Sequence, residues 1–309
     1  MSRVRTSLLA LLLGAFVAAC GSKEEGVAVS LRPDSTSAAK APSPEGPLRI
    51  GIGAMLSPSA TLDLYGRLVD ALGEELHRPA VMVQRATYAE MNDLLKAGRV
   101  DAALVCTGAY LQGKRDFGLE ALVVPSFDGS PTYRSVILVR TDSGIDRLED
   151  LEGKRFAFVD PLSNTGRMYA VRRLLELGRT PDDFFTWTYT HAHDKSIRAV
   201  KERLVDGAAV DELVYTFLRA REPAATEGLK VLERSEAFGA PPVVVVPTVT
   251  PALRAKLRQA FLGLTGSKTG RAILAGLSIE RFVEPTKGLY ESARRQIEFL
   301  RQHGEAPSR

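Results

Sequence analysis

Two short polar segments of this chain contain the residue types that could hold an anion. The first, Ser163-Asn164-Thr165-Gly166, lies shortly after the strand-like run Phe156-Ala-Phe-Val-Asp160 and precedes a stretch with helical periodicity. Hydroxyl, amide and backbone N–H groups at a helix N-terminus can surround an oxyanion, because the free donors and the helix dipole both favour negative charge. The same side chains could serve only as helix caps, and their spacing leaves both interpretations open.

The second segment, Thr190–Ser196, contains His191 and His193 and again precedes a helical pattern. One of these imidazoles could donate a hydrogen bond to an anion. No metal or cofactor is predicted, because the segment lacks the further Asp and His of an HxHxDH site and only His77 and His303 remain elsewhere.

Two other patterns have only a superficial likeness to catalytic or nucleotide-binding motifs. A hydrolase triad of Ser163, His193 and Asp206 is conceivable, but the chain lacks a GxSxG elbow. The segment Thr265–Gly270 lacks GxxxxGK[ST] and does not follow a strand, so it is predicted as a turn between helices. The sequence therefore predicts a protein that is not an enzyme.

Short β-rich runs alternate with helical periodicity from Leu48 onward, which predicts elements that could position these segments. The first series has strands expected at Leu48–Gly53, Val81–Gln84 and Ala102–Cys106. After an extended run at Ser135–Arg140, a second series has strands expected at Arg155–Val159, Phe185–Tyr189 and Ala208–Val210. A βαβαβ order predicts a parallel sheet covered by helices, so two α/β lobes are expected. Ligands of such sheets bind at the carboxyl ends of the strands, where both polar segments fall.

The chain is expected to cross twice between these lobes. Two extended segments, Ser135–Arg140 and Val243–Val246, flank the second series and predict a two-strand hinge. Residues 48–137 and 245–309 would form lobe 1, and residues 138–244 would form lobe 2. The closing helices, near Pro251–Leu264 and Leu289–Leu300, are expected to pack on lobe 1. A repeated Val-Asp-small-Ala pattern at Val100 and Val205 predicts the same helix-to-strand joint in each lobe.

The N-terminal region has the pattern of an export signal. Residues 1–19 contain Arg3 and Arg5, no acid, and an apolar stretch too short to span a bilayer. The run that ends at Cys20 resembles a bacterial lipobox, in which the cysteine is lipidated; an ordinary signal with a chance cysteine is the alternative. Residues 20–47 have the composition of a flexible tether. The other cysteine, Cys106, lies in an apolar run and is expected to be a buried thiol.

Composition predicts an ordinary folded protein beyond this tether. The 309 residues are 45% hydrophobic and 25% charged, which matches a globular chain of about two domains. The formal net charge is 41 − 37 = +4 and is not concentrated in a basic block. Nucleic acid is therefore not a predicted partner.

Several segments together resemble the phosphate/phosphite/phosphonate-binding proteins of ABC importers. They are Ser135–Arg140, Leu148–Lys154, Phe158–Gly166, His193-Asp194 with Ala199-Val200, and Val205–Asp211, within a likeness over most of Leu48–Leu300. The resemblance implies a two-lobed periplasmic binding protein of the type II-like fold. It implies an anion site formed by Ser163, Asn164, Thr165, Gly166 and His193, with Tyr65 and Tyr110 opposite. This chain has Ser-Asn-Thr where the family has Ser-Thr-Ser, which leaves the preferred anion open.

Asp211 could contact an ammonium group of an aminoalkyl ligand, or could cap the helix that begins at Glu212. The sequence as a whole predicts a lipid-anchored, extracytoplasmic solute-binding protein that presents a phosphonate-like small anion to an ABC permease. A sensor subunit for a membrane kinase or receptor is the alternative, and an enzyme with a binding-protein fold is the third possibility.

Overall fold

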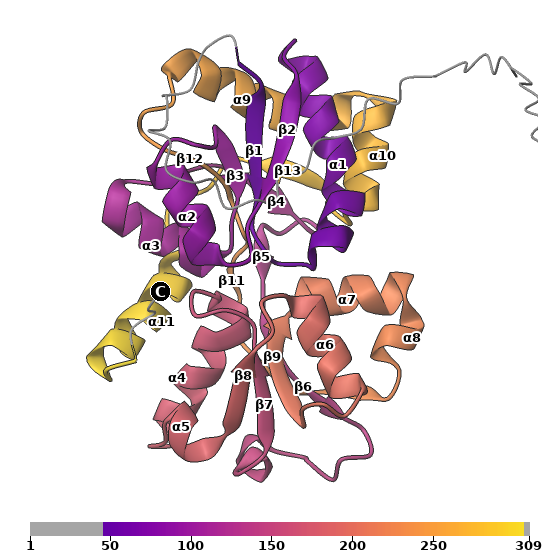
Figure 1. Cartoon of the computed structure of the whole chain (residues 1–309), viewed down its shortest axis with the longest axis vertical. Helices are drawn as coiled ribbons and strands as arrows, with labels where there is room; N and C mark the ends of the chain where they lie inside the picture. The colour runs from indigo at the N-terminus through magenta and orange to yellow at the C-terminus, as the bar shows by residue number, and fades with distance from the viewer. Residues whose placement is uncertain (1–45, 306–309) are drawn as a thin grey trace, which may run out of the picture.

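The computed structural model describes residues 46–305, which form two α/β lobes, one above the other in Figure 1. The expectations for the export signal, for Cys20 and for nearly all of the tether fall outside the described residues. One lobe has a six-stranded sheet in the order β13-β4-β12-β3-β1-β2, and the other has a five-stranded sheet in the order β10-β6-β9-β7-β8. The predicted fold class is confirmed.

The upper lobe contains most of the N-terminal half of the described chain together with a later segment. Its strands are β1 (Leu48–Ile52), β2 (Ala80–Gln84), β3 (Ala102–Leu104), β4 (Glu120–Ser126), β12 (Val243–Val245) and β13 (Arg281–Val283). Its helices are α1 (Pro58–Glu75), α2 (Tyr88–Lys96), α3 (Thr107–Phe117), α9 (Pro251–Gly263), the 3₁₀ turn η3 (Leu264–Gly266) and α10 (Lys268–Gly276).

The lower lobe is built from the middle of the chain. Its strands are β6 (Ser135–Arg140), β7 (Arg155–Phe158), β8 (Thr186–Tyr189), β9 (Gly207–Asp211) and β10 (Leu229–Arg234). Its helical segments are η1 (Leu148–Leu151), the π-helical turn η2 (Asn164–Met168), α4 (Tyr169–Glu176), α5 (Pro181–Phe184), α6 (His193–Lys201), α7 (Glu212–Arg221) and α8 (Pro223–Thr226).

Both sheets have a parallel core that is extended by antiparallel strands. β1 pairs in parallel with β2 and β3, and β7 pairs in parallel with β8 and β9, as the alternation of strands and helices predicted. The strands β12, β4 and β13, and β6 and β10, are antiparallel to their neighbours. Sequence analysis did not predict β4 or β13. β13 is too short for its pattern to be distinguished from a loop. β4 has seven residues, but it includes Pro125, and a proline within an apolar run argues against a strand.

The repeated Val-Asp pattern forms the same joint in each lobe, as predicted. The Asp101 carboxylate accepts hydrogen bonds from the backbone N–H of Arg49 at 2.7 Å and from its guanidinium. The Asp206 carboxylate makes the equivalent bonds to Arg155, with the backbone N–H at 3.0 Å. Each aspartate thus ties the start of one parallel strand to the start of its neighbour.

The hinge lies a few residues from the predicted segments. β5 (Thr132–Tyr133) and β11 (Phe238–Gly239) form a separate two-stranded antiparallel sheet between the two lobes (Figure 1). The segments expected to cross, β6 and β12, instead lie inside the lower and upper sheets. The expected boundaries at 137/138 and 244/245 therefore fall within strands, because the pattern of an extended run does not show which sheet it joins.

The last helix, α11 (Glu291–Gln302), is also placed differently from the prediction. Its buried residues Ala293, Ile297 and Leu300 belong to the apolar core of the lower lobe, together with Met168 and Val171. In Figure 1 α11 lies below α3 and beside α4, so it bridges the lobes instead of packing only on lobe 1. α9 does pack in the upper core, as predicted, through Leu257 and Phe261.

Two smaller features complete the fold. Ser267 caps α10 through its side-chain bond to the Gly270 N–H. The predicted turn between helices therefore lies at residues 265–267, and the rest of the Thr265–Gly270 segment is the first turn of α10. Within residues 46–305, no helix is long and apolar enough to cross a bilayer.

Candidate functional site

Six helical segments begin where the two lobes face each other. α1, α2 and α3 follow the parallel strands β1, β2 and β3, while η2, α6 and α7 follow β7, β8 and β9 (Figure 1). The first N–H groups of a helix have no partner within the helix and carry its positive dipole end. Their convergence makes the space between the lobes favourable for negative charge.

Hydrogen bonds join the two lobes directly at these helix starts. The Ser57 N–H donates to Asp194 Oδ1 at 2.9 Å, and the His193 N–H donates to the Met55 carbonyl at 3.0 Å. Asp160 of the lower lobe accepts from the Tyr88 N–H of the upper lobe at 3.2 Å. The structure therefore shows the lobes closed on each other.

Gly108, in the first turn of α3, permits this close approach. A Cβ atom at position 108 would lie 2.2 Å from the Leu162 carbonyl oxygen of the other lobe and 3.3 Å from the Asn164 nitrogen. Any larger residue would therefore push the lobes apart at the start of η2.

Two of the three polar side chains in the predicted anion segment have protein partners. The Ser163 hydroxyl accepts from the Gly166 N–H at 2.9 Å, so it caps the turn. The Asn164 amide accepts from Gln296 of α11 at 2.9 Å and donates to the Tyr133 hydroxyl at 3.3 Å. The capping interpretation thus describes Ser163, and Asn164 links the hinge strand β5 to α11.

Thr165 differs from its neighbours because its hydroxyl has no hydrogen-bond partner. The residue is fully buried, and its Oγ1 is an unsatisfied polar atom, although its carbonyl accepts from the Ser135 hydroxyl at 2.6 Å. A buried hydroxyl without a partner costs about 1–3 kcal/mol, so such an atom is expected where a ligand supplies the bond.

His193 is held as a neutral hydrogen-bond donor. Its Nδ1 accepts from the Asp211 backbone N–H at 2.9 Å, which places the single proton of the neutral ring on Nε2. Burial lowers the pKa of His193 to about 3, so the ring stays neutral at physiological pH. The Nε2–H group can therefore donate to an anion without a countercharge.

Asp211 and Tyr65 lie together on the α7 side of the interlobe region. The Asp211 side chain caps α7 by accepting from the Leu213 N–H at 2.7 Å, as the capping alternative predicted. Burial raises the pKa of Asp211 to about 7, so the carboxyl is partly protonated near neutral pH. Burial and the nearby Asp211 carboxylate raise the pKa of Tyr65 to about 12.

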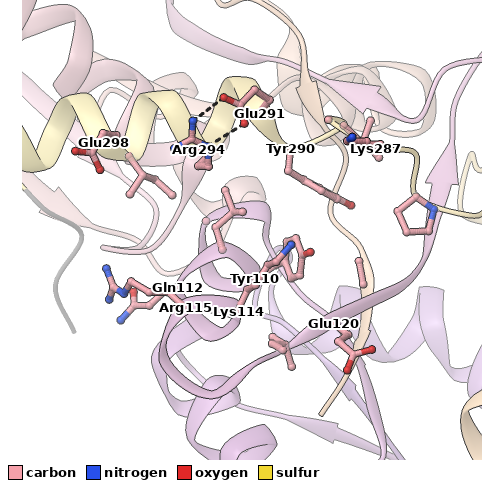
Figure 2. A pocket seen from close by; sticks show the side chains of 18 of the residues that line it. Tyr110, Gln112, Lys114, Arg115, Glu120, Lys287, Tyr290, Glu291, Arg294 and Glu298 are labelled. Carbon is pink, nitrogen blue, oxygen red and sulfur yellow. Dashed lines mark hydrogen bonds and ion pairs between the residues drawn. The ribbon is translucent and has the colours of Figure 1, made fainter. Parts of the chain in front are cut away.

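The structure does not bring Tyr110 to this group of residues. Its ring packs edge to face against Tyr290 at 4.9 Å between centroids, and Lys114 Nζ lies 5.8 Å from the ring centroid. Figure 2 shows these side chains in a groove between α3 and α11, where Arg294 pairs with Glu291. This groove of about 710 Å³ is a different cavity from the one lined by Tyr65 and Asp211.

Sequence reasoning missed Tyr88, a second buried residue with an unsatisfied hydroxyl. Its side chain is 1% exposed, and its oxygen has no partner. Burial, then the nearby Cys106 and Asp160, raise the pKa of Tyr88 well above its usual value. Its position could have been found by the rule used for Ser163, because Tyr88 is the first residue of the helix that follows β2.

Cys106 is a buried thiol, as predicted, and it lies at the interlobe face. It is 2% exposed, and burial raises its pKa to about 11 even though the Asn164 and Gly108 N–H groups donate to it. The thiol is therefore protonated and unreactive at neutral pH.

The other possible chemistries have no assembled site among the described residues. Asp206 is paired with Arg155 at the opposite end of the lower sheet from His193, so the conceivable hydrolase triad does not form. Residues 46–305 contain no group of three His, Cys, Asp or Glu side chains that could hold a metal ion. His191 is exposed and contacts Tyr189.

The fold and this interlobe region define a class of protein: a two-lobed α/β protein of the binding-protein fold, with helix N-termini facing each other between the lobes. Solved structures show the same fold. A binding protein component of an ABC phosphonate transporter from Pseudomonas aeruginosa superimposes with a TM-score of 0.77 at 20% identity, over 84% of this chain and 88% of that one. PhnD1 from Prochlorococcus marinus, solved with methylphosphonate, superimposes with a TM-score of 0.75 at 16% identity, over 85% of this chain and all of that one.

Residues 50–290 match the family described as "ABC transporter, phosphonate, periplasmic substrate-binding protein", and the chain belongs to this family. One relative is the phosphate-import protein PhnD of Mycolicibacterium smegmatis, 27% identical over 210 residues. That alignment covers 64% of this chain and 65% of the relative, so it spans slightly less than two thirds of the relative's length.

Proposed function

We propose that this chain is the extracytoplasmic solute-binding component of an ABC importer and holds a phosphonate-like oxyanion between its lobes. The observation that carries the proposal is the pair of buried, unsatisfied hydroxyls, Tyr88 in the upper lobe and Thr165 in the lower lobe. Each lies in the first turn of a helical segment at the interlobe face. Family membership, the phosphate-import relative and the structural neighbour solved with methylphosphonate support the same class of anion.

The available donors suit a tetrahedral oxyanion. His193 Nε2–H, the Tyr88 and Thr165 hydroxyls and the helix N-terminal N–H groups are all neutral donors, and the oxygens of a phosphonate have enough lone pairs to accept from each. Ser163, Asn164 and Gly166 then shape the turn that presents Thr165. Asp211 and Tyr65 border the site, and a protonated Asp211 avoids repulsion of the anion.

Closure over the ligand follows from this arrangement. Each lobe supplies only part of the donor set, and the paired strands β5 and β11 form a hinge between the lobes. The chain passes between the lobes again from β13 to the bridging helix α11. Closing excludes water, so each hydrogen bond to the anion is made in a medium of lower polarity than water. Such closure would give an ABC permease a ligand-loaded form to recognise.

We also propose that the chain is exported and anchored to a membrane by a lipid. Cys20 would carry the lipid, and residues 20–47 would tether the lobes to the outer side of a membrane. Cys20→Ser is expected to abolish incorporation of labelled palmitate and to release the protein from the membrane fraction. Equal labelling of Cys20→Ser and the parent protein would contradict the anchor.

Calorimetric titration with methylphosphonate, phosphate, phosphite and sulfate tests the binding function. We expect His193→Ala to weaken binding of the preferred anion by about five- to a hundredfold, because one buried donor is lost. His191→Ala is the matched control, since this exposed ring lies two residues away, and it should leave affinity unchanged. Binding that survives His193→Ala but not His191→Ala would contradict the site.

Transport and sensing are separated by a cellular assay. Uptake of the bound anion that stops when the chain is deleted supports delivery to a permease. Unchanged uptake, with loss of a ligand-dependent kinase response, would instead assign the chain to a sensor.

A further inference from the structure

An apolar cavity of about 260 Å³ adjoins the proposed anion site on the side of α7. Six of the apolar and aromatic side chains that line it come from both lobes: Leu64, Tyr65, Phe127, Val214, Phe217 and Ile279. Most of them are only half-buried, so their apolar surface still faces the cavity. Surface of this kind is stabilised when an apolar group covers it.

The charges around the cavity do not favour a second charged group of the ligand. No Lys, Arg or His is among the described residues that line it, and its two carboxylates are Asp128 and Asp211. Asp128 is exposed to solvent. The Asp211 carboxylate already accepts from the Leu213 N–H at 2.7 Å in its role as a helix cap. The wall therefore offers no positive charge for an acidic substituent, and its one buried carboxyl already serves as the cap of α7.

The cavity is continuous with the residues that hold His193. The Met55 carbonyl accepts from the His193 N–H, and the Asp211 N–H donates to His193 Nδ1. Both Met55 and Asp211 also line the cavity. A substituent on an anion bound by His193 would therefore reach this space directly.

We infer that the ligand of this chain is an organophosphonate whose carbon substituent is uncharged and apolar and occupies this cavity. The inference rests on the proposed function, because the cavity adjoins the anion site and forms no site by itself. Bare phosphate would leave this space to water, whereas a substituent of three or more carbons would cover the exposed side chains.

A ligand series measures this preference on the full-length protein. Calorimetric titration with phosphate, methylphosphonate, propylphosphonate and 2-aminoethylphosphonate is expected to show binding about fourfold tighter for each added methylene. Propylphosphonate and 2-aminoethylphosphonate have nearly the same size and differ by a methyl in place of an ammonium group. We expect the propyl compound to bind more tightly than the aminoethyl compound.

Variants that fill the cavity test whether the gain in affinity with substituent length arises there. Val214→Phe, on the α7 wall, should remove the advantage of propylphosphonate over methylphosphonate and leave methylphosphonate binding within about threefold of the parent. Val231→Phe is the matched control, because Val231 is a half-buried valine that packs against the same core cluster but does not line the cavity. Ala220→Leu, at an exposed position of the cavity wall, provides a second filling variant if Val214→Phe does not fold.

The outcomes separate this inference from the proposed function. Equal affinity for all four anions, or tighter binding of 2-aminoethylphosphonate than of propylphosphonate, would overturn the apolar substituent and leave the anion site in place. No binding of any of the four would overturn the proposed function as well. A chain-length effect that is unchanged in the folded Val214→Phe and Ala220→Leu variants would place the substituent outside this cavity.

Discussion

Thr165→Val should change stability and binding in opposite directions. Valine has the shape of threonine without the hydroxyl, and in the closed structure that hydroxyl is buried without a partner in the protein. Its removal should raise the free energy of unfolding by about 1 kcal/mol, because no hydrogen bond is lost and a buried polar group disappears. For a domain of this size, the melting temperature should rise by about 2–4 °C.

The same change should weaken binding of the preferred phosphonate by roughly five- to a hundredfold, because one oxygen of the anion loses its donor in a dry site. Differential scanning calorimetry without ligand and isothermal titration with ligand measure the two effects on one sample. The matched control is Thr226→Val, because the Thr226 hydroxyl is buried but donates to the Pro223 carbonyl at 3.2 Å in α8. This control should lower the melting temperature and leave the affinity unchanged.

A Thr165→Val protein that melts at a lower temperature and binds the anion as tightly as the parent would refute the reasoning. That result would mean that the Thr165 hydroxyl stabilises the free protein through local bonds and does not contact the ligand. An increase in stability with unchanged affinity would refute only the ligand contact, and the orphan hydroxyl would then be a defect of packing.

Three further predictions test neighbouring parts of the site. Tyr88→Phe should leave the melting temperature unchanged or higher and weaken anion binding at least fivefold in titration calorimetry, whereas unchanged affinity would exclude the Tyr88 hydroxyl as a donor. The folded protein holds the Asp211 proton up to about pH 7, whereas the unfolded chain releases it near pH 4, so the parent protein loses stability as pH rises from about 4 to 7. In urea titrations, Asp211→Asn should therefore raise the free energy of unfolding by roughly 3 kcal/mol more at pH 8 than at pH 5. A gain in stability that is independent of pH would contradict this prediction. Gly108→Ala should keep the lobes open in the presence of ligand, because its Cβ would clash with the Leu162 carbonyl oxygen, and solution scattering measures this. The control is Gly66→Ala in α1, which has open space around position 66, so this variant should contract with ligand as the parent does. Contraction of both variants would disprove the steric argument.

The sequence by itself determined the two α/β lobes and the strand ends that face the interlobe region. These features depend on local patterns: alternation of strands and helices, polar residues before helices, and a repeated Val-Asp joint. The helix that begins at Glu212 and the buried Cys106 thiol follow from the same local rules. A resemblance to known binding proteins added the family, which the comparison over residues 50–290 established.

The tertiary structure decided which polar atoms in those segments are free. Asn164 and Thr165 are neighbours in the sequence, yet the Asn164 amide is bonded to Gln296, 132 positions away, and the Thr165 hydroxyl has no partner. Tyr110 and Tyr88 both belong to helices that follow upper-lobe strands, but Tyr110 packs against Tyr290 of the chain's last segment. The hinge strands and the position of α11 were likewise set by long-range pairing. A local pattern fixes where a side chain lies along its element, but whether its polar atom is available to a ligand depends on which distant segment packs against it.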